Sequence, residues 1–405
     1  MRKGIIIWAL CLTLIELPAM AGNRIYSPRI QSLTSIVNGD WMNRPVLTLG
    51  SKDVLTIGFD ELSHNYRRLT VHLEHCEADW TVSEGLFESD WIEGFNDLQI
   101  DDYQNSLNTS VLYTHYKFEL PNDRCRLRMS GNYRLTITDE DDERLADVEF
   151  YVVEPMVQIA MEVTTNTDID HNTSHQQLEM KVQHDKLRLT NVEEELYTVV
   201  MQNWREDNAR TNVKPNYMAP RELIWQHNRS LIFEAGNEYH KFEMLDTDHT
   251  TMGLERIAWD GEHYQAWPMT ATTRRNYLTD VDADGAFCIR NSDRRESDYT
   301  CDYIMVNYTL EAPNDGPLYI DGHWTNHEPR DTYKMEYDDS GRCYRATIMQ
   351  KQGYYSYQLL TENNGIPPSE GSFYQTENCY QALVYYRAAA DRTWRLVGYQ
   401  SVQFR

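Results

Sequence analysis

Hydrophobic and polar residues alternate with a period of two along much of the chain. The alternation is clearest in five segments, at residues 69–73, 133–137, 148–152, 178–182 and 304–310. Successive side chains of a β-strand point to opposite faces, so each segment is expected to form a strand with one buried and one water-facing side. In the third segment Val148 and Phe150 would face a core, while Glu149 would face water.

Turn-forming residues separate these segments, and few stretches have the 3.6-residue period of a long helix. Runs rich in Asn, Asp, Gly and Ser occupy residues 130–132, 139–142, 314–317, 338–341 and 363–365. Short strands divided by such turns are typical of antiparallel β-sandwiches. We therefore expect an all-β protein built from β-sandwich domains.

Two places in the sequence suggest domain boundaries. Pro155 lies between two alternating segments, where a residue that donates no backbone hydrogen bond suits a hinge, and residues 291–298 are all polar. These seams predict three sandwiches in series, at residues 22–155, 156–296 and 297–405. The last residues, 396–405, are expected to form the final strand of the third sandwich.

The first residues have the pattern of a secretory signal peptide. Arg2 and Lys3 precede an apolar run at residues 5–15, and Ala19-Met20-Ala21 follows as a small-residue cleavage site. We predict a signal peptide at residues 1–21, cleaved after Ala21, with Gly22 as the new N-terminus. No later stretch approaches 18 apolar residues, so the mature chain is expected to be soluble and exported. The alternative is a buried N-terminal helix.

Six cysteines remain after the predicted cleavage: Cys76, Cys125, Cys288, Cys301, Cys343 and Cys379. An even count in an oxidising compartment is compatible with disulfides, although sequence cannot choose among the pairings. The pair closest in sequence, Cys288 with Cys301, is the simplest prediction. The alternative is that several are small buried apolar residues.

The chain is strongly acidic. Its 405 residues include 38 Lys and Arg and 63 Asp and Glu, which gives a net charge of −25. Removing Arg2, Lys3 and Glu16 with the signal peptide changes this value to −26. Such a charge argues against nucleic acid or an anionic membrane surface as the main partner.

The sequence contains no G-x-S-x-G elbow, P-loop, H-E-x-x-H or G-x-G-x-x-G motif. No catalytic, cofactor-binding or metal-binding residue is predicted. Asp280-Val281-Asp282-Ala283-Asp284-Gly285 resembles the start of a calcium loop, but position twelve is Asn291 instead of Glu. A tight acidic connection between strands is the favoured interpretation, with calcium as the alternative.

Many short motifs in order along the chain resemble a known family. They include His75-Cys76-Glu77-Ala78-Asp79-Trp80, Gln202-Asn203-Trp204-Arg205 and Lys351-Gln352-Gly353-Tyr354-Tyr355-Ser356-Tyr357. Together these motifs look like the type IX secretion system plug protein family. The resemblance implies a periplasmic protein of a Bacteroidota bacterium with no catalytic residues. It also implies a partner, the giant outer-membrane β-barrel translocon, whose periplasmic opening the protein would bind and seal without itself entering the membrane.

Three aromatic residues are the predicted contacts with this partner. Phe87, Trp91 and Phe95 lie close together in sequence, and aromatic side chains are frequent anchors of protein interfaces. The alternative is that they cap the first sandwich.

The third predicted domain has a second resemblance. Residues 318–327, with Met335, Gly353 and Tyr354, are similar to early-set, immunoglobulin-like modules, some of which bind α-glucans. Where such binders often place a Trp, this chain has His327, and Trp324 is expected in the core. Tyr355 and Tyr357 are expected to be buried, with Tyr354 on the opposite face. An exported glycan-binding β-sandwich protein is therefore the alternative function.

Overall fold

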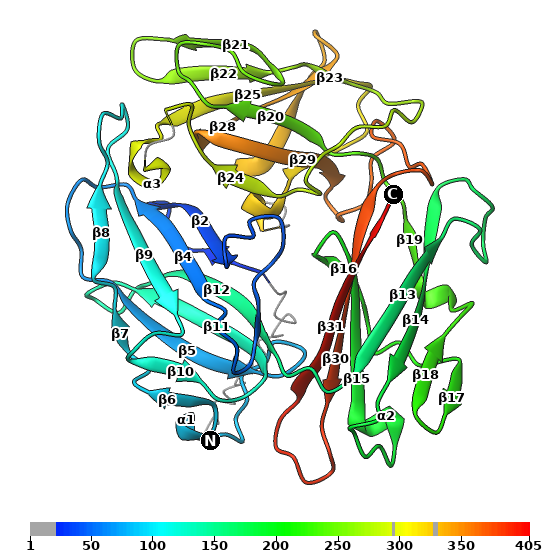
Figure 1. The fold of residues 1–405 in the computed structure, drawn as a ribbon. Helices are drawn as coiled ribbons and strands as arrows, with labels where there is room; N and C mark the ends of the chain where they lie inside the picture. The colour runs from blue at the N-terminus through cyan, green and yellow to red at the C-terminus, as the bar shows by residue number, and fades with distance from the viewer. Residues whose placement is uncertain (1–21, 294–295, 327–330) are drawn as a thin grey trace, which may run out of the picture.

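Regular structure is almost entirely β-strand (Figure 1). The computed structural model describes residues 22–293, 296–326 and 331–405. The predicted all-β class is confirmed, and the five alternating segments coincide with β5 (Thr70–Cys76), β11 (Gly131–Thr138), β12 (Arg144–Val153), β14 (His175–Gln183) and β25 (Tyr303–Glu311). The predicted signal peptide and His327 lie outside the described residues. Among the residues described, no helix is long and apolar enough to cross a membrane.

The first unit, residues 24–153, is a sandwich of two sheets. Its inner sheet has the order β1-β12-β11-β5-β7 with β3 paired to β12, and its added strands are β1 (Arg24–Ile25), β3 (Val46–Thr48) and β7 (Leu98–Gln99). Its outer sheet has the order β2-β4-β9-β8, made of β2 (Ile30–Val37), β4 (Leu55–Glu61), β8 (Asp102–Asn105) and β9 (Thr114–Leu120). Helix α1 (Glu88–Trp91) and the ribbon of β6 (Ile92–Gly94) and β10 (Cys125–Leu127) pack onto the same core.

The middle unit is a second sandwich, formed by residues 158–234 together with residues 378–404. One sheet has the order β13-β14-β18-β17 with β19 on β14, made of β14, β13 (Gln158–Thr164), β17 (Tyr217–Ala219), β18 (Glu222–Trp225) and β19 (Ile232–Glu234). The other has the order β16-β15-β30-β31, made of β15 (Leu196–Gln202), β16 (Arg205–Thr211), β30 (Asn378–Tyr386) and β31 (Arg395–Phe404). Two short helices, α2 (Val192–Glu195) and η1 (Arg229–Leu231), connect strands within it.

The inserted unit, residues 240–361, lies in the sequence between the two parts of the middle unit. Its curved sheet has the order β20-β29-β26-β27-β28-β25-β22-β21, with β23 on β25 and β24 on β29. Besides β25, its strands are β20 (His240–Met244), β21 (Leu254–Trp259), β22 (Tyr264–Pro268), β23 (Ala271–Thr272), β24 (Phe287–Ile289), β26 (Leu318–Asp321), β27 (Lys334–Asp338), β28 (Cys343–Lys351) and β29 (Gly353–Thr361). Its short helices are α3 (Ser297–Thr300), η2 (His323–Thr325) and η3 (Asp331–Tyr333).

This arrangement corrects the expected division after residue 296. Strands β20 to β24 precede that position yet pair within the inserted unit, because β24 pairs with β29 and β22 pairs with β25. The prediction that residues 396–405 complete the third sandwich is also wrong. In Figure 1, β31 and β30 stand beside β15, and β30 pairs with β15 from Leu196↔Tyr386 to Gln202↔Tyr380. The C-terminal strands complete the middle unit.

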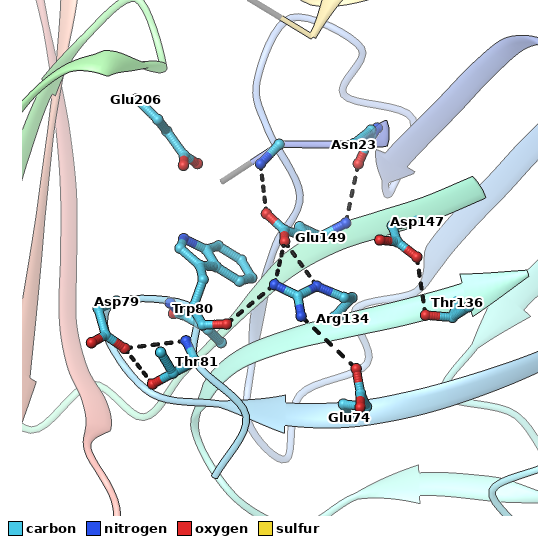
Figure 2. A network of polar contacts seen from close by, with 12 residues as sticks. Asn23, Glu74, Asp79, Trp80, Thr81, Arg134, Thr136, Asp147, Glu149 and Glu206 are labelled. Carbon is cyan, nitrogen blue, oxygen red and sulfur yellow. Dashed lines mark hydrogen bonds and ion pairs between the residues drawn. The ribbon is translucent and has the colours of Figure 1, made fainter. Parts of the chain in front are cut away.

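The inner sheet of the first unit is covered on both sides. One face forms the core with the outer sheet, and the other packs against β15, β30 and β31 of the middle unit. The contact between the units is apolar and centres on Trp80, Tyr151, Trp204, Tyr385 and Leu396. The expectation that β12 has a water-facing side is therefore wrong, because Glu149 is buried and ion-paired with Arg134 (Figure 2).

Buried charged and polar groups join the first unit to the inserted unit. Lys351 Nζ lies 2.5 Å from Asp60 Oδ2, and both side chains are buried. Tyr303 Oη donates to the same carboxylate oxygen at 2.6 Å, and His115 Nδ1 lies 2.7 Å from the other oxygen. Because paired buried charges resist separation, this contact and the apolar contact hold the three units together.

All six cysteines of the described chain are free thiols. The predicted disulfide between Cys288 and Cys301 is therefore wrong. Burial raises the pKa of Cys76 and of Cys301 to about 12, which keeps both thiols protonated and unreactive. The alternative interpretation of several cysteines as small buried residues fits this arrangement.

Candidate partner-binding surface

The three predicted partner contacts do not share one environment. Phe87 is 72% exposed and Phe95 is 71% exposed, whereas Trp91 is only 6% exposed. Aromatic side chains are frequent anchors of protein interfaces, and a ring must be accessible to act as one. Phe87 and Phe95 are therefore candidates for partner binding, and Trp91 is not.

Trp91 instead fixes this segment to the core of the first unit. It ends the single turn of α1, and its ring packs edge-on against Tyr133 with a centroid distance of 5.8 Å. The His75 ring lies 6.4 Å from the Trp91 ring and 5.1 Å from the Tyr133 ring, so the three rings form one cluster. Burial lowers the pKa of His75, so this imidazole stays neutral near pH 7. The predicted role of Trp91 as a partner contact is thus wrong, because the core of the first unit already buries its ring.

Hydrogen bonds and one ion pair hold the Phe87 backbone in place. The Asp90 carboxylate accepts a hydrogen bond from Phe87 N at 3.0 Å, and Asp90 N donates to Phe87 O at 2.8 Å. From the middle unit, Arg392 binds the Asp90 carboxylate at 3.1 Å and the carbonyl oxygen of Gly85 at 3.0 Å. The exposed ring is therefore carried by a segment that two units support.

Phe95 follows Gly94, a position where no residue other than glycine fits. Gly94 has φ +113°, and a Cβ at this position would lie 2.0 Å from the carbonyl oxygen of Arg124. Phe95 N donates to the same oxygen at 2.9 Å, immediately after the β6–β10 ribbon. The close backbone approach fixes where the chain leaves the ribbon, so the backbone of Phe95 is also well positioned.

The loop between β23 and β24 exposes two further apolar side chains, which the sequence pattern did not predict as partner contacts. Leu278 is 79% exposed and Val281 is 77% exposed, both between β23 and β24 of the inserted unit. The alternating aspartates around Val281 resemble a calcium loop, and this resemblance does not predict an exposed apolar side chain between them. An apolar residue isolated within a polar turn is the signal that would have identified it.

The acidic residues of this loop bind protein donors. Asp280 pairs with Lys241 at 2.6 Å, and Asp282 accepts hydrogen bonds from Tyr239 N at 2.5 Å and Asp284 N at 2.7 Å. Burial, and then the neighbouring carboxylate of Asp284, raise the pKa of Asp282 to about 8. Within the described ranges, no group of three or more His, Cys, Asp or Glu side chains is arranged to hold a metal ion.

The aromatic residues considered for sugar binding lie mostly inside the inserted unit. Tyr355 and Tyr357 lie in the main core of the inserted unit, whereas Tyr354 packs in a separate small cluster with Ala283 and Ala286, as expected for the opposite face of β29. All three rings are buried. Trp324 packs against Tyr355 and Tyr333 at centroid distances of 5.7 and 5.5 Å. These residues therefore form no exposed stacking platform.

Comparison with solved structures finds a strong structural relative. It is a hypothetical protein from Parabacteroides merdae, whose crystal structure at 2.30 Å resolution is 35% identical to this chain. The match covers 95% of this chain and 99% of that chain with a TM-score of 0.90. An alkylpurine DNA glycosylase from Pseudomonas fluorescens is 12% identical over 31% of this chain and 30% of that chain, and its TM-score of 0.17 indicates no shared fold. No curated protein matches.

A family model adds the identity of the first unit. Residues 30–154 match the family described as "Type 9 secretion system plug protein 1st domain". This range begins with β2 and ends just after β12, so it includes Phe87 and Phe95. The resemblance inferred from the sequence motifs is thereby confirmed. Residues 30–154 therefore belong to the family of the type 9 secretion system plug protein 1st domain.

Proposed function

We propose that this protein is a periplasmic plug, which binds and seals the periplasmic opening of the giant outer-membrane β-barrel translocon of type IX secretion. Family membership supports a role in type 9 secretion, with partners among the components of that system and a place in the cell envelope. It also favours a structural role over an enzymatic one. The predicted signal peptide agrees with a periplasmic location on the inner side of the outer membrane.

One observation identifies the residues that we propose bind the barrel. Phe87 and Phe95 expose most of their rings from a braced segment that lies within the part of the chain matched to the plug domain. Rigid aromatic anchors lose little conformational entropy on binding and contribute a large share of interface energy. These two rings are the proposed contacts with the barrel.

The packing of the three units suits a seal. A stopper must keep its shape under load, and relative motion of domains is expected when their contacts are small and polar. Here the first and middle units share an apolar contact, and a buried ion pair joins the first and inserted units. The protein would therefore present its rim-binding residues on a rigid body.

The negative charge of the chain predicts the character of the partner. The mature chain, with a net charge of −26 after loss of Arg2, Lys3 and Glu16, is repelled by acidic surfaces and attracted by basic ones. We expect a basic rim around the opening of the barrel and binding that weakens as salt concentration rises. Binding that is insensitive to salt would contradict this part of the proposal.

A double substitution tests the proposed contacts. The variant Phe87→Ala with Phe95→Ala should lose roughly thirtyfold or more in affinity for the barrel, because each of the two lost aromatic anchors costs about 1 kcal/mol or more. The control variant, Tyr217→Ala with Met218→Ala, removes two similarly exposed apolar side chains from the middle unit.

Binding is measured by biolayer interferometry, with the barrel purified from the outer membrane of the source bacterium in mild detergent. Loss of affinity in the first variant alone supports the proposed contacts. Equal affinity of both variants and the wild type would refute them. Retention of the wild type on insoluble glucan, without binding to the barrel, would favour the glycan-binding alternative.

A further inference from the structure

The backbone nitrogen of Gly22 lies at a buried carboxylate. Gly22 N is 2.5 Å from Glu149 Oε2, and both residues are buried. Glu149 lies on the face of β12 that the sequence pattern assigns to water, and its own backbone nitrogen donates to Asn23 Oδ1 at 3.1 Å (Figure 2). The position where the predicted signal peptide ends is thus tied to the inner sheet of the first unit.

Groups from all three units surround this nitrogen. Glu206 of the middle unit binds Arg44 at 3.1 Å and accepts a hydrogen bond from Tyr151 Oη at 2.9 Å. A Cβ built on Gly22 would lie 3.6 Å from the guanidinium of Arg44 and 3.6 Å from the carbonyl oxygen of Asn326 in the inserted unit. The first position after the predicted cleavage site therefore lies where the three units meet.

Negative charge dominates around Glu149. Arg134 binds Glu149 Oε1 at 3.0 Å, but the same guanidinium also lies 3.9 Å from Glu74, so one cation serves two carboxylates (Figure 2). Burial, and then the nearby carboxylate of Glu206, raise the pKa of Glu149 to about 7. A further positive charge at Glu149 Oε2 would stabilise its ionised form.

The predicted cleavage would create such a charge at this nitrogen. Hydrolysis of the Ala21–Gly22 peptide bond by a signal peptidase consumes one water and leaves a carboxylate on Ala21 and an amino group on Gly22. This amino group takes up a proton and becomes an ammonium ion near neutral pH. A peptide N–H offers one uncharged donor, whereas an ammonium offers three donors and a full positive charge.

We propose that the α-ammonium group of Gly22, released by removal of the signal peptide, binds Glu149 and locks the three units at their junction. Maturation would then complete the fold, because the precursor has an uncharged amide at the same position. The inference rests on the predicted cleavage after Ala21 and is independent of the proposed plug function. Its test therefore needs no secretion component.

The decisive measurement is the pKa of the α-amino group in the mature protein. The chain beginning at Gly22 is released from an N-terminal fusion by a protease, and the rate of reductive methylation of its N-terminus is followed by mass spectrometry across pH. An amine paired with a buried carboxylate should have a pKa at least about one unit above the usual range of about 7.7–8.0. At pH 7 its reaction would then be about tenfold slower than that of an exposed terminus.

Three variants separate the ion pair from general effects of burial. Glu149→Gln should return the pKa to the usual range, whereas Glu143→Gln, an exposed carboxylate just before β12, should not. A chain extended by Ala21 moves the ammonium by about 3.8 Å and should melt at a lower temperature. In the Glu149→Gln background the extension should have little further effect, since both changes remove one interaction.

Two results would overturn the proposal. One is an α-amino pKa within the usual range in the wild-type chain that begins at Gly22. The other is a mature protein, isolated from the source bacterium, whose N-terminus is not Gly22. Both measurements use the wild-type protein, so they decide the question even if Glu149→Gln fails to fold.

Discussion

The buried ion pair between the first and inserted units leads to a quantitative stability prediction. Lys351 Nζ lies 2.5 Å from Asp60 Oδ2, and the side chains are 1% and 0% exposed. The ammonium also donates to the carbonyl oxygen of Asp298 at 2.6 Å and lies 4.2 Å from the centroid of the Tyr113 ring. Lys351→Met removes the charge and keeps most of the aliphatic stem, so Asp60 stays buried without its main counter-ion.

The expected cost follows from what Asp60 retains. Removing one partner of a buried ion pair costs about 3–5 kcal/mol, because the remaining charge stays desolvated. His115 and Tyr303 still bind the carboxylate, at 2.7 and 2.6 Å, which places the expected loss near the lower end, about 3 kcal/mol. With an unfolding entropy of about 2.1 cal/mol/K per residue over roughly 380 residues, Tm should fall by about 4 °C.

Differential scanning calorimetry at pH 7 measures this change. The matched control is Lys117→Met, because Lys117 forms an exposed pair with Glu119 on β9. An exposed pair contributes about 0–1 kcal/mol, so the control should melt within about 1 °C of the wild type. If Lys351→Met lowers Tm no more than Lys117→Met does, the reasoning about the buried pair is wrong.

The pH dependence of the difference provides a second check. Burial alone would raise the pKa of Asp60, but the charge of Lys351 and the hydrogen bond from His115 outweigh it, and the pKa lies below 3.8. A carboxyl group with a lowered folded pKa stabilises the fold fully above its unfolded pKa of about 3.9, and this stabilisation is lost as pH falls through the folded value. The difference in Tm between wild type and Lys351→Met should therefore shrink below about pH 4.

Three further predictions concern other buried groups. Trp91→Ala should cost about 3–5 kcal/mol in urea unfolding, because the ring fills the first core; a loss below about 1 kcal/mol would contradict its burial. Asp282→Asn should flatten the pH dependence of stability: the folded pKa is raised to about 8, so the stabilisation from protonated Asp282 is full below about pH 4 and lost as pH rises through about 8. Urea unfolding at pH 5 and pH 8 tests this prediction. If the free energy of unfolding changes between the two pH values as much in Asp282→Asn as in the wild type, the prediction is wrong. Alkylation in denaturant without reductant should modify all six cysteines of the mature chain, and fewer modified thiols in the mass spectrum would indicate a disulfide.

The sequence predicts strands well but not which strands pair over long distances. Alternation identifies β11 and β25 because each has one face against a core. Nothing in the local pattern of residues 378–404 reveals that β30 pairs with β15, since pairing depends on complementary edges far apart in the chain. The insertion of one unit within another was therefore missed.

The sequence also does not predict which polar faces become buried. Glu149 has the pattern of a water-facing residue, and only the packing of the middle unit against the inner sheet shows that it is buried and paired. The candidate site shows that the exposure of aromatic residues is equally hard to predict. Phe87, Trp91 and Phe95 are all aromatic, but Trp91, at the end of the single turn of α1, lies in the core. Residue type predicts that a side chain favours burial, while the fold decides whether a core or a partner buries it.

We propose above all that this protein binds the periplasmic opening of the outer-membrane secretion barrel. The most direct measurement is to tag the chain after Arg405, extract the outer membrane of the source bacterium in mild detergent, and identify what copurifies by mass spectrometry. The plug proposal predicts a very large outer-membrane β-barrel protein in near-equal amount. Recovery of the protein free in the periplasm, or held by polysaccharide with no barrel attached, would contradict it.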